Sequence, residues 1–344
     1  MRALIRSIQY YLPENTLTNA DLASQHPDWR VEKIGAKTGI EERHVSGPEE
    51  FSSDLAVQAA SKLFSEGVCS PSEVDYLLLC TQSPDYFLPT TACLVQERLG
   101  LPVSAGALDF NLGCSGFVYG LGLAKGLIET GQARNALLIT SETYSKFLHP
   151  EDRATRTIFG DAAAATLVEG TPDPPHPDGC WIGPFVYGTD GRGALNLIVR
   201  AGGLRVPRSS ETAKPARDEA GNLRVDDNLY MNGPELFTFT IREVPGAVEQ
   251  LLARSGKTID SIDLFVFHQA NQFMLEHLRS QLRIPVEKFW LSLARCGNTV
   301  SASIPIALKE AEVAGVLHAG NLVMVLGFGV GYSWAGALIR WMGQ

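Results

Sequence analysis

Short apolar runs and longer stretches of helical periodicity alternate along the first half of the chain. The runs at 76–80 and 136–140 are continuous and apolar, which is typical of strands buried on both faces, and a short strand is also predicted at 108–111. Residues 93–99 and 114–130 have the length and pattern of helices. Alternating strands and helices predict an α/β fold with mostly internal strands.

An earlier helix has signals at both of its ends. Apolar residues recur at helical spacing at Leu55, Ala59 and Leu63. Ser53 is suited to cap the N-terminus and Gly67 to end the helix. We therefore expect this helix to begin at Ser53 and to stop at Gly67.

The same order of elements occurs twice. Residues 74–99 are similar to residues 262–282, because each segment holds an acidic residue, an apolar strand, a polar loop and a helix in that order. Residues 113–139 match residues 297–324 in the same way. Both pairs are about 185 residues apart, which is too far for a solenoid repeat. Two copies of one α/β unit explain the pattern, and chance similarity of two generic α/β segments is the alternative.

The length agrees with two such units, because 344 residues correspond to a little over two domains of about 150 residues each. We place the N-terminal half at 1–170 and the C-terminal half at 171–344. Residues 171–179 and 207–227 are rich in Pro, Asp, Gly and Ser and predict loops. The span 171–227 is therefore expected to contain an insertion, either a solvated linker or a cap over a site.

Composition and charge exclude several classes of protein. The net charge is −9, whereas a nucleic-acid binder normally carries a basic patch. No apolar run approaches the roughly 18 residues that cross a bilayer, and the start has no signal-peptide pattern. Six cysteines without a C-x-x-C pair predict neither a disulfide scaffold nor a zinc site. We expect a reduced, cytoplasmic protein without a metal.

Cys114 is the sharpest candidate for a catalytic residue. It follows a short strand and opens the helix predicted for 114–130, between Gly113 and Ser115. A thiol at the N-terminus of a helix is favoured as thiolate by the helix dipole, and small neighbours let a substrate approach the sulfur. The alternative is a buried cysteine acting as a small hydrophobic residue, which is our interpretation of the other five.

His268 and Asn298 are weaker candidates when each is considered alone. His268 follows an apolar strand and begins the stretch HQAN, at a sheet edge where catalytic groups often lie; a structural histidine is the alternative. Asn298 would by itself be interpreted as a helix cap. It nevertheless holds the position in the second repeat that Cys114 holds in the first. If the two copies pack about a pseudo-twofold axis, all three residues meet in one site.

A glycine-rich turn near the C-terminus supplies a fourth element. Residues 327–334 (GFGVGYSW) follow an apolar strand at 322–326. The third glycine is misplaced for a dinucleotide-binding fingerprint, and no helix follows. As a tight turn, the segment can present backbone N–H groups to an oxyanion.

Several longer motifs occur in a fixed order along the chain. They are YLPEN and TNADL near the start, KTGIEERH at 37–44, GCSG at 113–116, EDRATRTIFGDAAAA at 151–165, HQAN at 268–271, GNTVSASIP at 297–305 and GYSW at 331–334. With these motifs, the chain resembles the β-ketoacyl-acyl-carrier-protein synthase III family over nearly its whole length. The resemblance implies a thiolase-like α/β fold of five layers, α-β-α-β-α, made of two duplicated halves, and a homodimer.

The resemblance also implies a catalytic triad of Cys114, His268 and Asn298. Cys114 would attack an acyl-CoA thioester and hold the acyl group as CoA leaves, with no further cofactor. The oxyanion would be held by backbone N–H groups of Cys114 and of the turn at Val330 and Gly331. His268 and Asn298 would stabilise the enolate of a malonyl thioester as it loses CO2, whether CoA or an acyl-carrier protein carries it. The product would be a β-ketoacyl thioester.

Further positions correspond to the family's binding residues for the CoA nucleotide. Arg153 matches the residue that contacts it, and Asp161 lies in the structural Gly-Asp motif. Lys37 takes the place of an arginine, and Lys33 that of the tryptophan that stacks on the adenine. A lysine can neutralise phosphate, but it cannot stack as an indole does.

Three more positions concern the acyl chain and the carrier. Leu88 corresponds to the residue that limits acyl length, and Asn271 is expected to support the site. Phe273 replaces the arginine that docks the acidic carrier protein, so an acidic chain such as this one would need a basic patch elsewhere. These departures favour a specialised pathway over housekeeping fatty-acid synthesis.

Two other activities are compatible with the same residues. One is acyl transfer to an oxygen or nitrogen nucleophile without decarboxylation. The other is hydrolysis by a Cys–His–Asn protease of the papain type. Papain-like proteases carry their cysteine in a different context, C-G-[SA]-C-[WY].

Overall fold

The computed structural model describes residues 1–172, 182–218 and 221–343, and it has five layers. The first sheet has the order β1-β7-β6-β4-β5. Its strands are β1 (Arg2–Tyr11), β4 (Tyr76–Cys80), β5 (Gly106–Phe110), β6 (Asn135–Glu142) and β7 (Ala162–Thr171). The second sheet has the order β13-β14-β15-β8. Its strands are β8 (Ile182–Thr189), β13 (Leu264–Phe267), β14 (Leu322–Gly329) and β15 (Ser333–Arg340).

The second sheet repeats the topology of the first. In the first sheet, β4 is parallel to β6, β6 is antiparallel to β7, and β7 is antiparallel to β1. In the second, β13, β14, β15 and β8 pair in the same order and with the same directions. A parallel bridge between Phe265 and Phe289 stands where β5 pairs with β4 in the first sheet. The duplication expected from the sequence repeat is thus confirmed.

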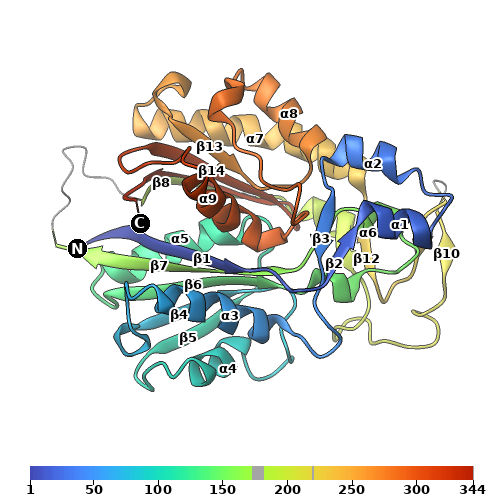
Figure 1. The fold of residues 1–344 in the computed structure, drawn as a ribbon, viewed down its shortest axis with the longest axis horizontal. Coiled ribbons are helices and arrows are strands. Elements are labelled where there is room, and N and C mark those ends of the chain that lie inside the picture. The colour runs from blue at the N-terminus through green and yellow to red at the C-terminus, as the bar shows by residue number, and fades with distance from the viewer. Residues whose placement is uncertain (173–181, 219–220, 344) are drawn as a thin grey trace.

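Helices fill the three remaining layers (Figure 1). α5 and α9 lie between the sheets, where α5 contacts strands of both. α3 and α4 cover the outer face of the first sheet, and α7 packs on that of the second, beside α8. Their bounds are α3 (Ser52–Ser65), α4 (Thr91–Arg98), α5 (Gly116–Glu129), α7 (Gly233–Ser255), α8 (Gln272–Gln281) and α9 (Ser303–Val313). The expected α-β-α-β-α arrangement is confirmed.

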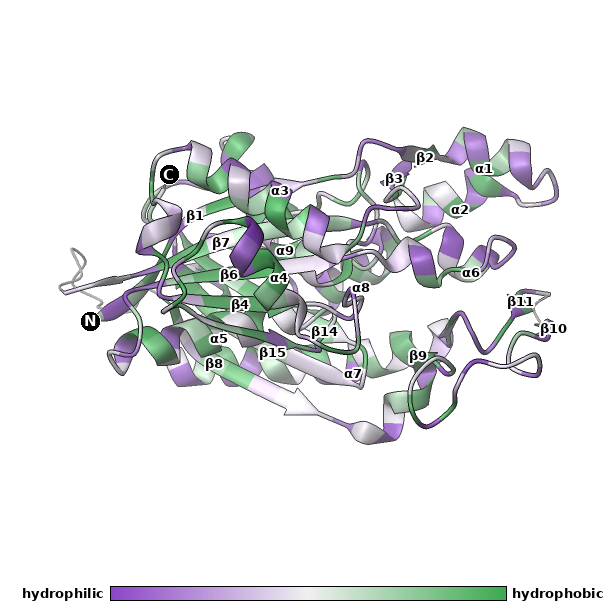
Figure 2. Cartoon of the chain, turned by 90° about the horizontal axis from the view of Figure 1, so that it is seen from below, coloured by the Kyte–Doolittle hydropathy of each residue, from purple (hydrophilic) through white to green (hydrophobic). Residues whose placement is uncertain are grey.

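The central strands are apolar throughout because both of their faces are covered. In β4, Leu77 and Leu79 pack in the core beneath α3 and α4, whereas Leu78 belongs to the core around α5. In β13, Phe265 faces the core beneath α7 and α8, and Val266 faces α5 and α9. Successive side chains point to opposite faces of a strand, so a run without polar residues is what a doubly covered strand requires. Figure 2 shows hydrophobic residues concentrated in these layers.

Two insertions gather at one end of the layered body (Figure 1). The N-terminal insertion follows β1, and the C-terminal insertion follows β8. Between β6 and β7 lies the short helix α6 (Arg153–Arg156). The N-terminal insertion holds β2 (Thr16–Thr18), α1 (Asn19–Gln25), α2 (Val31–Thr38) and β3 (Glu42–His44). The C-terminal insertion holds β9 (Leu197–Val199), β10 (Ala216–Arg217), β11 (Leu223–Arg224) and β12 (Leu229–Met231).

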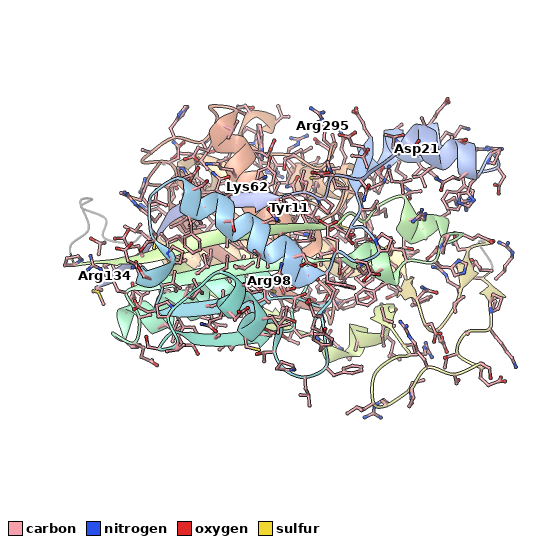
Figure 3. All side chains as sticks on the ribbon, turned by 60° about the horizontal axis from the view of Figure 1, so that its bottom comes forward. Tyr11, Asp21, Lys62, Arg98, Arg134 and Arg295 are labelled. Atoms are coloured by element: carbon pink, nitrogen blue, oxygen red, sulfur yellow. The ribbon has the colours of Figure 1, made fainter. Side chains whose placement is uncertain are left out.

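Charged side chains attach the outer helices to the first sheet and to each other. The Lys62 ammonium of α3 lies 5.3 Å from the centre of the Tyr11 ring at the end of β1 (Figure 3). Arg98 of α4 forms an ion pair of 2.8 Å with Asp54 of α3. Both contacts are partly exposed, and such pairs stabilise a fold by only about 0–1 kcal/mol each. The apolar cores therefore dominate the packing of this layer.

Most predicted elements of the first half are confirmed, with small differences at their ends. The helix expected from Ser53 begins at Ser52, and its N-cap is Phe51, so the predicted cap is wrong. The Ser53 hydroxyl donates instead to Asp85, across the loop after β4. The loop predicted at 171–179 falls mostly on residues outside the described ranges. Among the described residues, no helix is long and apolar enough to cross a membrane.

Candidate active site

Cys114 lies in a tight turn between β5 and α5, two residues before the helix begins at Gly116. It is buried, with 5% of its surface exposed. The end of β14 packs directly against this turn. A Cβ added at Gly327 would lie 2.4 Å from the carbonyl oxygen of Cys114, and one added at Gly329 would lie 2.8 Å from its Sγ. Glycine at these two positions lets the C-terminal half approach the cysteine.

The thiol of Cys114 is protonated at rest, contrary to the expected thiolate. Burial raises its pKa to about 12, and the nearby carboxylate of Glu142 adds to this shift. Hydrogen bonds from the backbone N–H groups of Cys114 and Val330 to the sulfur oppose it. The helix dipole by itself favours the thiolate. In the folded protein, removal of the thiol from water outweighs it.

His268 directly follows β13 and is buried. Its backbone N–H donates to the Leu326 carbonyl at 2.8 Å, which continues the pairing of β13 with β14. Its Nδ1 lies 2.7 Å from the Ser303 hydroxyl oxygen at the start of α9. Burial lowers the pKa of the imidazole to about 3, so the ring is neutral at physiological pH.

Asn298 is held by its backbone and by one end of its side chain. Its backbone N–H donates to the Ile158 carbonyl at 2.9 Å. Its Oδ1 accepts from the Val300 N–H at 2.9 Å, and its Nδ2 lies 3.5 Å from Nε2 of His268. Nδ2 also donates to the Ala270 carbonyl at 3.4 Å, and because Oδ1 is occupied, the amide nitrogen faces the imidazole and the cavity beside it.

The glycine-rich turn places one backbone N–H on the nucleophile. The N–H of Val330 hydrogen-bonds the sulfur of Cys114, as does the N–H of Cys114 itself. Gly331 has a φ of 110°, a conformation that other residues rarely adopt, and leads the chain into β15. Two N–H groups that converge on the nucleophile can stabilise an oxyanion formed there. A part in this for the Gly331 N–H stays a prediction.

A cavity of about 570 Å³ brings these residues together. Its lining includes Cys114, His268, Asn298, Lys37, Arg153, Asn271 and Phe273. These residues come from segments far apart in the chain, from Lys37 of α2 to Asn298 in the loop before α9. The fold joins them in one cavity, as the sequence predicted for the three triad residues.

Leu88 does not belong to this cavity. Its side chain is 86% exposed, in a loop where the neighbouring Phe87 is 81% exposed. Leu88 therefore does not line the cavity of its own chain, and its part in limiting the length of an acyl group stays a prediction. Lys33 is exposed and likewise lies outside the cavity lining. Asp161 is structural, because it accepts hydrogen bonds from the N–H and hydroxyl groups of Ser46 and Ser145.

Aromatic residues form part of the cavity rim. Phe273 is 49% exposed and stacks on Phe237 with ring centres 5.6 Å apart. The Lys37 ammonium lies 5.1 Å from the centre of the Phe273 ring. Asn271 caps α8 through a 2.9 Å hydrogen bond from the Met274 N–H. This rim combines an apolar surface with a cation.

Sequence reasoning missed several residues that support the site. Ser303 contacts the imidazole, and Val300 orients the amide of Asn298. Both lie in the motif GNTVSASIP, so the motif carried a signal that was not assigned to single residues. Asn222 of the segment 207–227 is buried and lines the cavity. The composition of the segment 207–227 predicts only a loop, and nothing in the sequence shows which residue of that loop points into the cavity.

Comparisons with known proteins agree with the fold and show the family. A model of the 3-oxoacyl-[acyl-carrier-protein (ACP)] synthase III family matches residues 108–191, and one of the C-terminal part of that family matches residues 252–341. A β-ketoacyl-[acyl-carrier-protein] synthase III of Caldanaerobacter subterraneus is 38% identical over 96% of this chain and 95% of its own. Synthase III 2 of Bacillus subtilis is 38% identical over 99% of both chains.

A solved structure has a higher sequence identity to this chain than these two relatives. The crystal structure of a 3-oxoacyl-(acyl-carrier-protein) synthase III is 54% identical, covers 99% of this chain and 100% of its own, and superposes with a TM-score of 0.96. Fold and site together define a thiolase-like acyltransferase. The chain belongs to the 3-oxoacyl-[acyl-carrier-protein] synthase III family.

Proposed function

We propose that the protein transfers an acyl group from acyl-CoA to Cys114 and condenses it decarboxylatively with a malonyl thioester. The product is a β-ketoacyl thioester. The observation that carries the proposal is one cavity that holds a thiol with two N–H groups on its sulfur, a neutral imidazole and an oriented amide. Membership of the synthase III family supports decarboxylative condensation in general.

The first step forms an acyl-enzyme. The sulfur of Cys114 attacks the thioester carbonyl, and the N–H groups of Cys114 and Val330 hold the oxygen as it becomes negative. The bond between the carbonyl carbon and the CoA sulfur breaks, and the thiol proton ends on CoA. Because burial keeps the thiol protonated at rest, the proton leaves the sulfur only as the attack proceeds.

The second step makes and consumes an enolate. The malonyl carboxylate leaves as CO2, and the electron pair of the broken bond enters an enolate whose oxygen accepts hydrogen bonds from His268 and Asn298. This role requires the imidazole proton on Nε2. Ser303 Oγ accepts from the Gln269 N–H at 3.4 Å and can give its own proton to Nδ1, which supports that tautomer. The enolate carbon then attacks the acyl carbonyl, and Cys114 leaves and regains a proton.

Two cavity residues are suited to the polar part of the substrates. Lys37 and Arg153 can neutralise phosphate groups of CoA or of a carrier's phosphopantetheine. We infer a malonyl thioester on either CoA or an acyl-carrier protein. The Phe273 rim offers an apolar contact where a basic one would favour an acidic carrier protein.

We also infer a homodimer. Tyr86, Phe87 and Leu88 form an exposed apolar loop with side chains 62%, 81% and 86% exposed. Three neighbouring exposed apolar side chains are typical of a surface that a protein partner covers. A mass measurement in solution tests this, and a monomer at micromolar concentration would contradict it.

Intact-mass spectrometry after exposure to a panel of acyl-CoAs tests the proposed function. The wild-type protein should gain one acyl group and lose it when malonyl-CoA or malonyl-carrier protein is added, with a β-ketoacyl product. Cys114→Ala should gain none. Cys296→Ala is the matched control, because Cys296 is also buried but lies outside the cavity lining. The proposal would be refuted if the wild-type protein formed no adduct, or if Cys114→Ala formed an equal one.

The same experiment separates the alternatives. Acyl transfer to an oxygen or nitrogen nucleophile would discharge the acyl-enzyme without a malonyl thioester and would survive loss of Asn298. A hydrolase would release free acid into buffer alone.

A further inference from the structure

Glu142 is a fully buried carboxyl group to which the proposed mechanism assigns no step. It is the last residue of β6, in the N-terminal half. Its Oε2 accepts hydrogen bonds from the Gln82 N–H at 3.0 Å and the Ser83 hydroxyl at 3.2 Å. Its Oε1 accepts from the Ser301 hydroxyl at 2.7 Å, in the C-terminal half. Within the described residues, no cation forms an ion pair with it. Buried carboxyl groups are costly to retain, so this one needs an explanation.

Ser301 lies between the two residues that hold the catalytic His268 and Asn298. It belongs to the 3-10 turn Val300–Ala302, which leads directly into α9. On one side, the Val300 N–H donates to Oδ1 of Asn298 at 2.9 Å. On the other side, Ser303 Oγ lies 2.7 Å from Nδ1 of His268. A shift of this turn would therefore move both catalytic groups together.

The turn is in a conformation that needs outside support. Val300 has a φ of 54°, in the left-handed region that a β-branched side chain rarely adopts. Such strain persists at functional sites only where surrounding contacts determine the conformation. The side chain of Val300 packs toward Gly113, beside the nucleophile. The bond from Ser301 to Glu142 fixes the same turn from the opposite half of the molecule.

We propose that Glu142 is a positioning residue which, through Ser301, holds the turn 300–302 so that Asn298 and His268 meet the malonyl carbonyl. The hydrogen bond between Ser301 and Glu142 is called the tether below. The inference rests on the proposed function and assigns the tether to the second step of that reaction. The acylation step uses Cys114 and the N–H of Val330, which the tether does not hold. Loss of the tether should therefore slow decarboxylation and condensation while leaving acylation of Cys114 intact.

Hydrogen bonding, and not negative charge, is what the tether requires. Burial raises the pKa of Glu142 to about 8, so the protonated form dominates near neutral pH. A neutral carboxyl accepts from the Gln82 N–H, and because the Ser301 hydroxyl can rotate, it can either accept from Ser301 or donate to it. A glutamine amide can do the same, with its oxygen toward Gln82 and its NH2 group toward Ser301. Glu142→Gln thus preserves the tether, whereas Ser301→Ala removes it.

Thr299→Val supplies the matched control. Thr299 lies in the same loop, between Asn298 and the turn, and is fully buried. Within the part of the chain that the structure describes, its hydroxyl has no hydrogen-bond partner, so an isosteric valine removes a buried hydroxyl without breaking a described contact. A general disturbance of this loop would affect Thr299→Val and Ser301→Ala alike.

The experiment measures the two half-reactions separately in all three variants. Acylation is followed by intact mass with acyl-CoA, and the second step by CO2 release from malonyl-CoA on pre-acylated enzyme. We expect Ser301→Ala to lower the second rate at least about tenfold, because misplacement by about 1 Å can cost 100-fold, and to leave acylation within about twofold. Glu142→Gln and Thr299→Val should stay within about threefold of wild type in both steps.

Three results would overturn the inference. They are wild-type CO2 release by Ser301→Ala, equal losses of both half-reactions in that variant, and a loss in Glu142→Gln as large as in Ser301→Ala. If Ser301→Ala is not obtained folded, Ser301→Cys replaces it, since a thiol is a weaker and longer donor and should give a smaller loss confined to the second step. A wild-type enzyme that releases no CO2 would instead refute the proposed function.

Discussion

The side-chain nitrogen of Asn298 lies 3.5 Å from Nε2 of His268, and neither group is free to turn away. The amide oxygen of Asn298 is held by Val300, and the far nitrogen of the imidazole by Ser303. Two donors that are aimed at one point, each held from behind, form a preorganised site for a developing negative charge. In the proposed function, this pair would stabilise an enolate oxygen, whereas the two backbone N–H groups at Cys114 would bind the acyl carbonyl.

Replacement of Asn298 by Asp should separate these two functions. The carboxylate can still accept from the Val300 N–H, but it offers no donor and repels an enolate. We expect the rate of malonyl decarboxylation to fall at least about 100-fold, in the range measured for loss of one oxyanion donor. Acylation of Cys114 should stay within a few-fold of wild type, as measured by intact mass. Equal loss of both steps would contradict the division of roles.

Removal of one backbone donor should impair the first step. Val330→Pro lacks the N–H that hydrogen-bonds the Cys114 sulfur, and we expect acylation to slow by about 100- to 1,000-fold. Val330→Ala keeps the N–H and should remain within a few-fold of wild type. Rapid-quench acylation with acyl-CoA measures both variants. If Val330→Pro reacts at the rate of Val330→Ala, the oxyanion is bound elsewhere.

A single methyl group at Gly329 should disable the nucleophile. The added Cβ would lie 2.8 Å from Sγ of Cys114, so the thiol or the strand must shift. We expect Gly329→Ala to lose most acylation. Gly246→Ala is the control, because among the described residues no other part of the chain lies within 4 Å of a Cβ added at that position in α7. A helical alanine there should leave activity unchanged and stabilise the fold by about 0.5–1 kcal/mol in thermal unfolding.

The stability of the protein should depend on pH through Glu142. Its pKa is raised by burial from 4.5 to about 8, so between these values the unfolded chain releases a proton that the folded protein retains. Stability from this group is present below pH 4.5 and is lost as the pH rises toward 8, by up to about 1.4 kcal/mol per pH unit. Glu142→Gln lacks this loss, so its free energy of unfolding relative to wild type should increase from pH 5 to pH 8. Denaturant titrations at both pH values measure the difference, and a constant difference would refute it.

Replacement of Arg153 should change the kinetics only for substrates that carry phosphate groups. We expect Arg153→Ala to raise KM for acyl-CoA about tenfold, because a cation that faces phosphate is lost. An acyl N-acetylcysteamine thioester, which lacks phosphate, should react equally well with both proteins. Initial rates with the two substrates make the comparison. An equal effect on both would place Arg153 in the catalytic step or in folding.

Much of this architecture can be predicted from local patterns in the sequence. The run 76–80 became β4 because a strand covered on both faces must be apolar at every position. The spacing of the repeat predicts that Asn298 and Cys114 meet in one site, and both line the same cavity. These predictions succeeded because periodicity and duplication are properties of the sequence itself.

Other features depend on contacts between residues far apart in the chain. The expected thiolate at Cys114 failed because the pKa of a thiol depends on burial and on neighbours such as Glu142, which no local pattern reports. The sequence also gives no sign that the loop of Leu88 points away from the cavity of its own chain.

The sequence by itself thus determined the two α/β units, the candidate catalytic residues and the order of the motifs. The tertiary structure alone decided which groups are neutral, which N–H meets the sulfur, and that Glu142 reaches Ser301 across the two halves. The physical reason is that protonation and hydrogen-bond geometry follow from desolvation and from distances across the fold, whereas secondary structure follows largely from neighbours along the chain.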